Sequence, residues 1–186
     1  MWLQVQLAIF ALATVILAYV FRASLTRPRS HGFYRFFVFE AIMALLLLNA
    51  RQWFRDPFAW HQLISWFLLV GSLIPLVAGL RALHIYGAPN SSNRNEAGLL
   101  AFERTSRLVS EGIYRYIRHP LYSSLLLLTW GIFFKSPSGI SAVLGFVATV
   151  GLVLMAIMEE AECVRAFGPE YQAYMRHTRR FIPHVY

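Results

Sequence analysis

Gly112-Ile-Tyr-Arg-Tyr-Ile-Arg-His-Pro-Leu-Tyr122 is the stretch that decides the fold, because it runs directly into an apolar segment that begins at Leu121. The stretch combines Arg115, Arg118 and His119 with three tyrosines. Basic and aromatic side chains at the edge of an apolar segment either anchor a chain at the membrane surface or form a site for a charged ligand. The rest of the sequence has to separate these two interpretations.

The composition around this stretch is that of a membrane protein. Of 186 residues, 58% are hydrophobic, 16% are aromatic and 14% are charged, which is not the balance of a water-soluble domain. We therefore predict one all-α integral membrane domain over residues 1–186, with a three-span unit at 1–86 and a loop, a two-span hairpin and a helical tail at 87–186. The five predicted transmembrane helices are Trp2–Phe21, Phe36–Ala50, Phe58–Leu80, Leu121–Phe134 and Ile140–Met158.

The fourth predicted span is short for a bilayer. A helix needs about 20 apolar residues to cross the hydrocarbon core, whereas Leu121–Phe134 offers 14. Two alternatives follow. Either the helix extends back into the motif and draws Tyr114 and Arg118 to membrane depth, or it crosses with local thinning of the bilayer.

The distribution of basic residues predicts the orientation. Fourteen of the seventeen Lys and Arg residues follow the first, third or fifth span, and Arg51, Arg55 and Lys135 lie on the other side. By the positive-inside rule the N-terminus is outside and the C-terminal tail is cytoplasmic. Because the arginines border the spans, the net charge of +8 indicates contact with membrane lipids and not with nucleic acid. We expect the plasma (inner) membrane of a microbe; the oligomeric state is not indicated.

A second dense region follows the fifth span, beginning at Glu159-Glu160. Helix signals continue to Ala166, Gly168 is the expected stop, and Pro169-Glu170 starts another helix with an acid in its first turn. On that helix Tyr171 and Tyr174 share a face. Because spans four and five form a hairpin, this region is expected to meet the Arg-His-Pro run.

Together the two regions supply cations, carboxylates and aromatic rings. Arginine binds carboxylate or phosphate, carboxylates accept hydrogen bonds from ammonium or hydroxyl groups, and tyrosine faces attract sulfonium. S-adenosylmethionine carries all of these partners. The alternatives are a solvated acidic pair at Glu159-Glu160 and an interfacial belt formed by the tyrosines. The sequence lacks a Gly-rich nucleotide loop, a His-Glu-x-x-His pair and a Gly-x-Ser-x-Gly elbow, so we predict no metal site and no hydrolase.

Two further features have open interpretations. Glu40 lies in the second predicted span, where an acid is costly, so it is either a substrate contact or a rim residue paired with Arg35. The segment 87–98 is rich in Gly, Pro, Asn and Ser and is either a lid or a linker.

The order of these motifs resembles the isoprenylcysteine carboxyl methyltransferase family, whose wider relatives include phospholipid N-methyltransferases. The resemblance rests on Leu108–Tyr122, then Glu159-Glu160, then Phe167-Gly168-x-x-Tyr171-x-x-Tyr174 and Arg180-x-x-Pro183. It covers roughly Gly98–Pro183 and leaves out the first three spans. One departure is Ser124, where many relatives have glycine.

The resemblance implies a membrane methyltransferase that binds S-adenosylmethionine and takes a lipophilic acceptor from the bilayer. By this likeness Tyr114, His119, Pro120 and Tyr122 would line the cofactor pocket, joined by Tyr171 and Tyr174, with Glu159 and Glu160 holding its polar groups. Arg118 or Arg180 would bind the cofactor carboxylate or position the acceptor. The expected catalytic residues are Arg118, His119, Glu159 and Arg180.

The resemblance favours carboxyl O-methylation of a prenylated thiol compound, with N-methylation of an ethanolamine phospholipid as the alternative. A carboxylate acceptor needs no base, whereas an amine must lose a proton to His119 or a glutamate. More distant alternatives are an oxidoreductase that uses NADPH, because sterol reductases share a similar Arg-His-Pro-x-Tyr hairpin, and a non-catalytic membrane protein.

Overall fold

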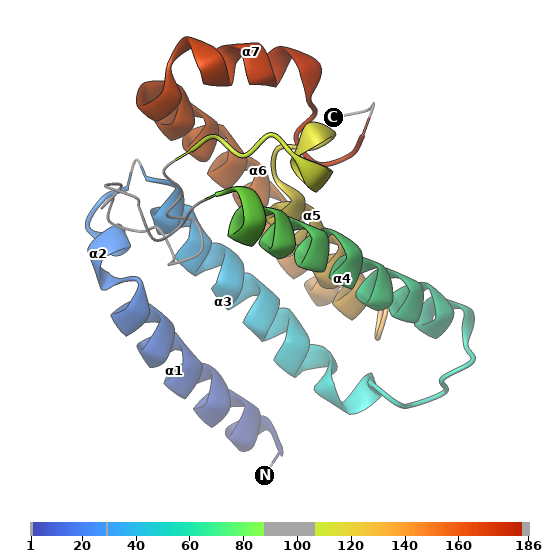
Figure 1. The fold of residues 1–186 in the computed structure, drawn as a ribbon. Coiled ribbons are helices and arrows are strands. Elements are labelled where there is room, and N and C mark those ends of the chain that lie inside the picture. The colour runs from blue at the N-terminus through green and yellow to red at the C-terminus, as the bar shows by residue number, and fades with distance from the viewer. Residues whose placement is uncertain (1, 29, 88–106, 184–186) are drawn as a thin grey trace.

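The computed structural model describes residues 2–28, 30–87 and 107–183, and in these ranges the regular elements are helices (Figure 1). Of the segment 87–98, whose role as lid or linker the sequence left open, residues 88–98 lie outside the described residues. Two short 3-10 turns are η1 (Ala50–Gln52) and η4 (Gly112–Arg115). The α-helices are α1 (Trp2–Val20), α2 (Arg22–Leu25), α3 (His31–Asn49), α4 (Trp60–Tyr86), α5 (Pro120–Phe133), α6 (Gly139–Phe167) and α7 (Pro169–His177).

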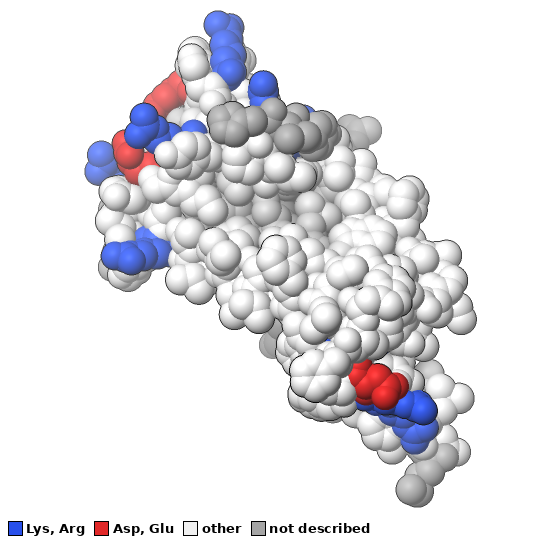
Figure 2. All heavy atoms as spheres, turned by 90° about the vertical axis from the view of Figure 1, so that its right-hand side faces the viewer, with Lys and Arg blue, Asp and Glu red and all other residues white. Residues whose placement is uncertain are grey.

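Four of these helices, α1, α3, α4 and α6, are long and apolar enough to cross a membrane. They run side by side, and the start of α1 and the end of α6 lie at opposite ends of the molecule (Figure 1). Figure 2 shows charged side chains at both ends of one face and an uncharged belt between them, the pattern of a protein that crosses a bilayer. The chain therefore has an all-helical, multi-pass architecture, while a fifth span and the orientation stay predictions.

Helix α5 is the short apolar helix that the sequence indicated. It has 14 residues and begins at Pro120, a proline in the first helical turn. Proline fits there because its missing N–H would have no partner in the helix. The helix does not extend back beyond Pro120, so the alternative in which it includes Tyr114 and Arg118 is wrong: Tyr114 lies in η4 and Arg118 in the link before α5.

The core forms where α3 packs on α6 and α4 packs on α5. Leu45 of α3 and Leu152 of α6 are fully buried there. Small residues let the backbones approach closely: a Cβ added at Gly151 of α6 would lie 2.5 Å from the Val38 side chain of α3. This packing fixes α6 relative to α3 and carries the end of α6 to the same level as the start of α5.

The end of the bundle where α5 finishes contains a buried lysine. Lys135 is 1% exposed; its Nζ donates to Gln62 Oε1 at 3.0 Å and lies 3.4 Å from the centroid of the Trp66 ring. A cation–π contact of this kind stabilises an ammonium that has little water around it. Lys135 therefore ties the α5–α6 hairpin to α4.

Helix α1 has no buried residues and contacts α3. The Thr14 hydroxyl of α1 donates to Glu40 Oε2 at 2.8 Å. This hydrogen bond places Glu40 at the α1–α3 contact, and Glu40 is not among the residues that line the pocket described below.

The predicted helix boundary after the last long helix is confirmed. Gly168 has φ +58° and ends α6, and α7 begins at Pro169 with Glu170 in its first turn. Positive φ favours glycine over any residue with a Cβ. Tyr171 and Tyr174 share a face of α7, with ring centroids 5.6 Å apart.

Candidate active site

The C-terminal tail pairs with the motif before α5 through backbone hydrogen bonds. The Arg118 N–H donates to the Arg179 carbonyl at 2.7 Å, and the His119 N–H donates to the Arg180 carbonyl at 3.0 Å. The Arg179 N–H in turn donates to the Tyr116 carbonyl at 3.1 Å. The prediction that the two dense regions meet is therefore confirmed, and the tail after α7 holds them together.

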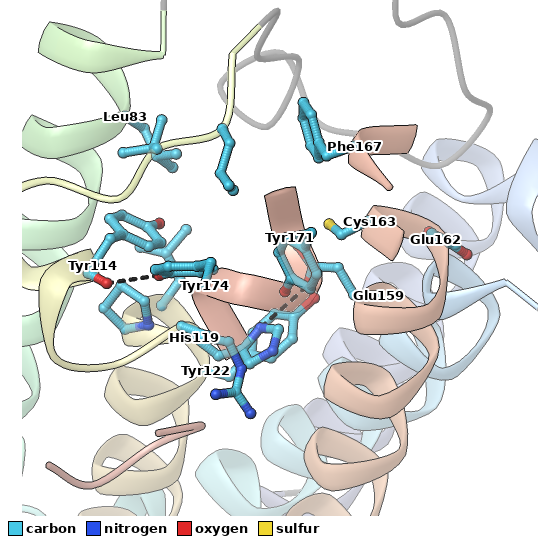
Figure 3. Close-up of a pocket in the computed structure, with 15 residues that line it drawn as sticks. Leu83, Tyr114, His119, Tyr122, Glu159, Glu162, Cys163, Phe167, Tyr171 and Tyr174 are labelled. Carbon is cyan, nitrogen blue, oxygen red and sulfur yellow. Dashed lines mark hydrogen bonds and ion pairs between the residues drawn. The ribbon is translucent and has the colours of Figure 1, made fainter. Parts of the chain in front are cut away.

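A pocket opens between these regions at the end of the bundle (Figure 3). Its empty space is about 770 Å³ when the open mouth is included. Carboxylates and aromatic rings come from α6 and α7, and the opposite wall comes from η4, the start of α5 and the end of α4. The lining residues are Leu83, Leu108, Val109, Tyr114, Arg118, His119, Pro120, Leu121, Tyr122, Glu159, Glu162, Cys163, Phe167, Tyr171 and Tyr174.

Beside the pocket, two arginines grip one buried carboxylate. Arg118 Nε donates to Glu160 Oε1 at 2.9 Å, and Arg180 Nη2 donates to Glu160 Oε2 at 2.9 Å. The Glu160 side chain is 5% exposed, and those of Arg118 and Arg180 are 8% and 24% exposed. Arg118 also donates to the Thr178 carbonyl. The cluster links α6, the start of α5 and the tail.

His119 lies between the two neighbouring glutamates. Its Nδ1 is 3.5 Å from Glu159 Oε2, its Nε2 is 3.4 Å from Glu160 Oε1, and its ring stacks on Tyr122 with centroids 5.2 Å apart. Burial of the imidazole lowers its pKa, but the hydrogen bonds to both carboxylates and their negative charges outweigh this effect. The pKa of His119 is therefore raised above its ordinary value, which favours the imidazolium.

Helix α7 forms a lid of tyrosines over this group. The Tyr174 hydroxyl donates to the Tyr114 carbonyl at 2.6 Å, which fixes α7 on η4 (Figure 3). Burial raises the pKa of both Tyr171 and Tyr174 well above the ordinary value. Both side chains therefore stay neutral and offer hydroxyl groups and ring faces to a ligand.

The structure brings most of the predicted site residues to one pocket. Glu160 and Arg180 do not line it; they lie behind its wall, and both arginines direct their guanidinium groups to Glu160. Glu40 belongs to the α1–α3 contact. The predicted residues that line the pocket are Tyr114, Arg118, His119, Pro120, Tyr122, Glu159, Tyr171 and Tyr174.

Sequence reasoning missed a second carboxylate in the pocket. Glu162 accepts a hydrogen bond from the His31 backbone N–H at 3.2 Å and contacts His31 Nδ1 at 2.5 Å, so it caps the start of α3. Its position three residues after Glu159 puts both on one helical face, which was a usable signal. The role of His31 had no signal, because it depends on the packing of α3 against α6.

Pocket and fold define a class: a multi-pass helical membrane protein with a polar, aromatic site where a helical hairpin ends. A family model described as phospholipid methyltransferase matches residues 62–170, more than half of the chain. The chain belongs to this family, in the superfamily that includes the isoprenylcysteine carboxyl methyltransferases, so the resemblance is confirmed. The family is one of membrane methyltransferases. No curated protein matches the chain.

Proposed function

We propose that the protein transfers a methyl group from S-adenosylmethionine to a lipophilic acceptor that enters from the bilayer. The pocket supports this proposal most, because residues of the Arg-His-Pro-x-Tyr motif at the start of α5 and Glu159 near the end of α6 line it together. Family membership supports the reaction type. The pocket residues are the proposal's cofactor-binding set.

The chemistry of the lining residues fits the cofactor. Glu159 and Glu162 offer carboxylates to ammonium or ribose hydroxyls. The aromatic faces of Tyr114, Tyr122 and Phe167 suit a sulfonium and an adenine ring. The first turn of α5 presents backbone N–H groups, which favour a carboxylate. When bound, S-adenosylmethionine supplies an electrophilic methyl group.

The other residues of the site position these groups. Arg118 and Arg180 hold Glu160, and Glu160 with Glu159 orients the His119 ring. Such pre-organisation contributes to methyl transfer because the reaction depends on aligning donor and acceptor and on excluding water. In this proposal Arg118 and Arg180 act as positioning residues, while His119 and Glu159 contact the ligands.

For the acceptor, we propose a reaction most like carboxyl O-methylation of isoprenylcysteine, following the motif order. N-methylation of an ethanolamine phospholipid is the second candidate, and a specific observation favours it. Glu159 lines the pocket, and its carboxylate is placed to take the proton that an ammonium acceptor must lose, whereas Glu162 is bound to His31. The product distinguishes the two, because alkali releases methanol from a methyl ester but leaves an N-methyl group in place.

We further propose that the site faces the cytoplasm of a microbial cell and that the protein lies in the plasma (inner) membrane. Fourteen of seventeen basic residues support this side. The acceptor and the surrounding lipids are the partners that the proposal requires.

Cofactor binding is tested by calorimetric titration of the purified full chain with S-adenosylhomocysteine in lipid nanodiscs. We expect saturable binding that Glu159→Gln weakens by at least about tenfold, the loss of roughly one charged hydrogen bond. The matched control is Glu111→Gln, an exposed glutamate outside the pocket. No binding by the wild-type chain in nanodiscs or in several detergents would overturn the proposal.

The oxidoreductase alternative is tested in the same titration. NADPH should neither bind nor displace S-adenosylhomocysteine, since the proposed site recognises a sulfonium and an ammonium. Binding of NADPH that displaces S-adenosylhomocysteine would favour a reductase instead.

A further inference from the structure

A second hollow lies on the other side of the backbone pairing that holds the tail, and we call it the basic groove. It is lined by Arg115, Tyr116, Arg176, His177, Arg179 and Pro183. None of these residues lines the pocket proposed above to bind S-adenosylmethionine, which we call the methyl-donor pocket. Arg115 and Tyr116 come from η4 and the residue after it, and the others come from the end of α7 and the tail. The 3.1 Å hydrogen bond from the Arg179 N–H to the Tyr116 carbonyl joins the two walls of the groove.

The groove gathers positive charge that no described residue neutralises. Among the residues that the structure describes, no carboxylate lines the groove, and the guanidinium groups of Arg115, Arg176 and Arg179 make no hydrogen bond or ion pair. Arg118 and Arg180, only a few residues away, both pair with Glu160. Like charges gathered without a counter-charge repel one another, so an anion in the groove would relieve this repulsion.

The arginines indicate which anion fits. A guanidinium presents paired N–H donors that match phosphate oxygens. His177 Nδ1 is engaged with the Ala173 carbonyl at 3.0 Å, which leaves its Nε2 for another partner. A phosphate group therefore suits the groove better than a cationic or a neutral ligand.

Apolar side chains around the groove indicate that the phosphate belongs to a lipid. Tyr116, which lines the groove, and Ile182, which precedes the lining residue Pro183 in the sequence, are each 55% exposed. Tyr116 lies four residues before Pro120, the first residue of α5, so the groove is near the level at which the bundle's helices end. Exposed aromatic and aliphatic groups next to arginine are typical of the headgroup region of a bilayer.

We propose that the basic groove binds the phosphate of an anionic phospholipid from the leaflet at this end of the bundle. The bound headgroup would join η4 to α7 and so brace the pairing that closes the methyl-donor site. Lipid binding in the groove does not require the methyl transfer reaction.

The test is native mass spectrometry of the detergent-purified full chain titrated with phosphatidylglycerol or phosphatidylcholine. We expect one tight phosphatidylglycerol adduct and no matching phosphatidylcholine adduct. The triple variant Arg115→Gln/Arg176→Gln/Arg179→Gln should lose affinity for that adduct by roughly fivefold for each arginine removed.

A matched control removes three exposed arginines near the same end of the bundle but outside the groove, as Arg27→Gln/Arg81→Gln/Arg165→Gln. It should keep the tight adduct, and both variants should keep the wild-type melting temperature. Equal loss in the two triple variants, or equal binding of phosphatidylcholine, would overturn the proposal. Displacement of the lipid by millimolar inorganic phosphate would also overturn it, in favour of a soluble phosphate ligand.

Discussion

At the scale of single residues, the site depends on one buried glutamate. Glu160 forms ion pairs with Arg118 and Arg180 and contacts His119, so it joins the motif, α6 and the tail. Removing one partner of a buried ion pair is costly because the remaining charge loses its counter-charge without regaining water. Glu160 is therefore expected to matter for folding as well as for ligand binding.

We predict that Glu160→Gln destabilises the protein by about 3 kcal/mol, toward the lower end for a buried pair because Arg180 is 24% exposed. Thermal or denaturant unfolding in detergent measures the change. Glu111→Gln, at an exposed position, is the control and should change the stability little. A change of less than about 0.5 kcal/mol in Glu160→Gln, the range of ordinary surface substitutions, would contradict the role assigned to Glu160.

We predict that the contribution of His119 to the stability of the fold depends on pH. Its pKa is raised in the folded protein, so the stabilisation it gives is present below about pH 6.5, its unfolded pKa, and is lost as the pH rises through the folded pKa. The melting temperature of the wild type should therefore exceed that of His119→Gln by more near pH 5 than near pH 9. An equal difference at both pH values would show that stacking on Tyr122, and not charge, accounts for the effect.

At the scale of helices, the position of α6 against α3 carries the Glu-Glu pair to the start of α5. We predict that Gly151→Ala destabilises the protein by about 1–3 kcal/mol, because the new Cβ would lie 2.5 Å from Val38 and force the two helices apart. Gly71→Ala on α4 is the matched control, since nothing lies within 4 Å of its added Cβ. Unfolding in detergent compares them; equal stability of the two variants would contradict the close packing.

The sequence predicted those helix features that depend on local chemistry. Pro120 begins α5, and Gly168 ends α6 at a positive φ, as their residue types indicate. The hairpin also predicted that the tail meets the motif. The sequence could not show that Arg118 and Arg180 share Glu160, or that Glu162 caps α3 through His31. Those contacts depend on how helices far apart in sequence pack together.

At the scale of the whole molecule, charge is divided between the ends of an apolar bundle (Figure 2). The distribution of arginines predicts that the pocket end is cytoplasmic. In a Cys163→Ser background, Arg55→Cys should react with an impermeant maleimide on intact cells, whereas Gln172→Cys on α7 should react only after permeabilisation. Labelling in the reverse order would contradict the proposed orientation. Both positions are exposed, so access to the reagent depends on the side of the membrane.

The activity that we propose for this membrane protein is the transfer of a methyl group from S-adenosylmethionine to a lipophilic acceptor. The most direct measurement incubates the purified chain with S-adenosylmethionine labelled in its methyl group and a total lipid extract, followed by mass spectrometry of the lipids. We predict that one lipid class gains the labelled methyl group, and that Glu159→Gln greatly reduces this product while Glu111→Gln does not. Transfer of no label to any lipid by a chain that binds S-adenosylhomocysteine would contradict the account.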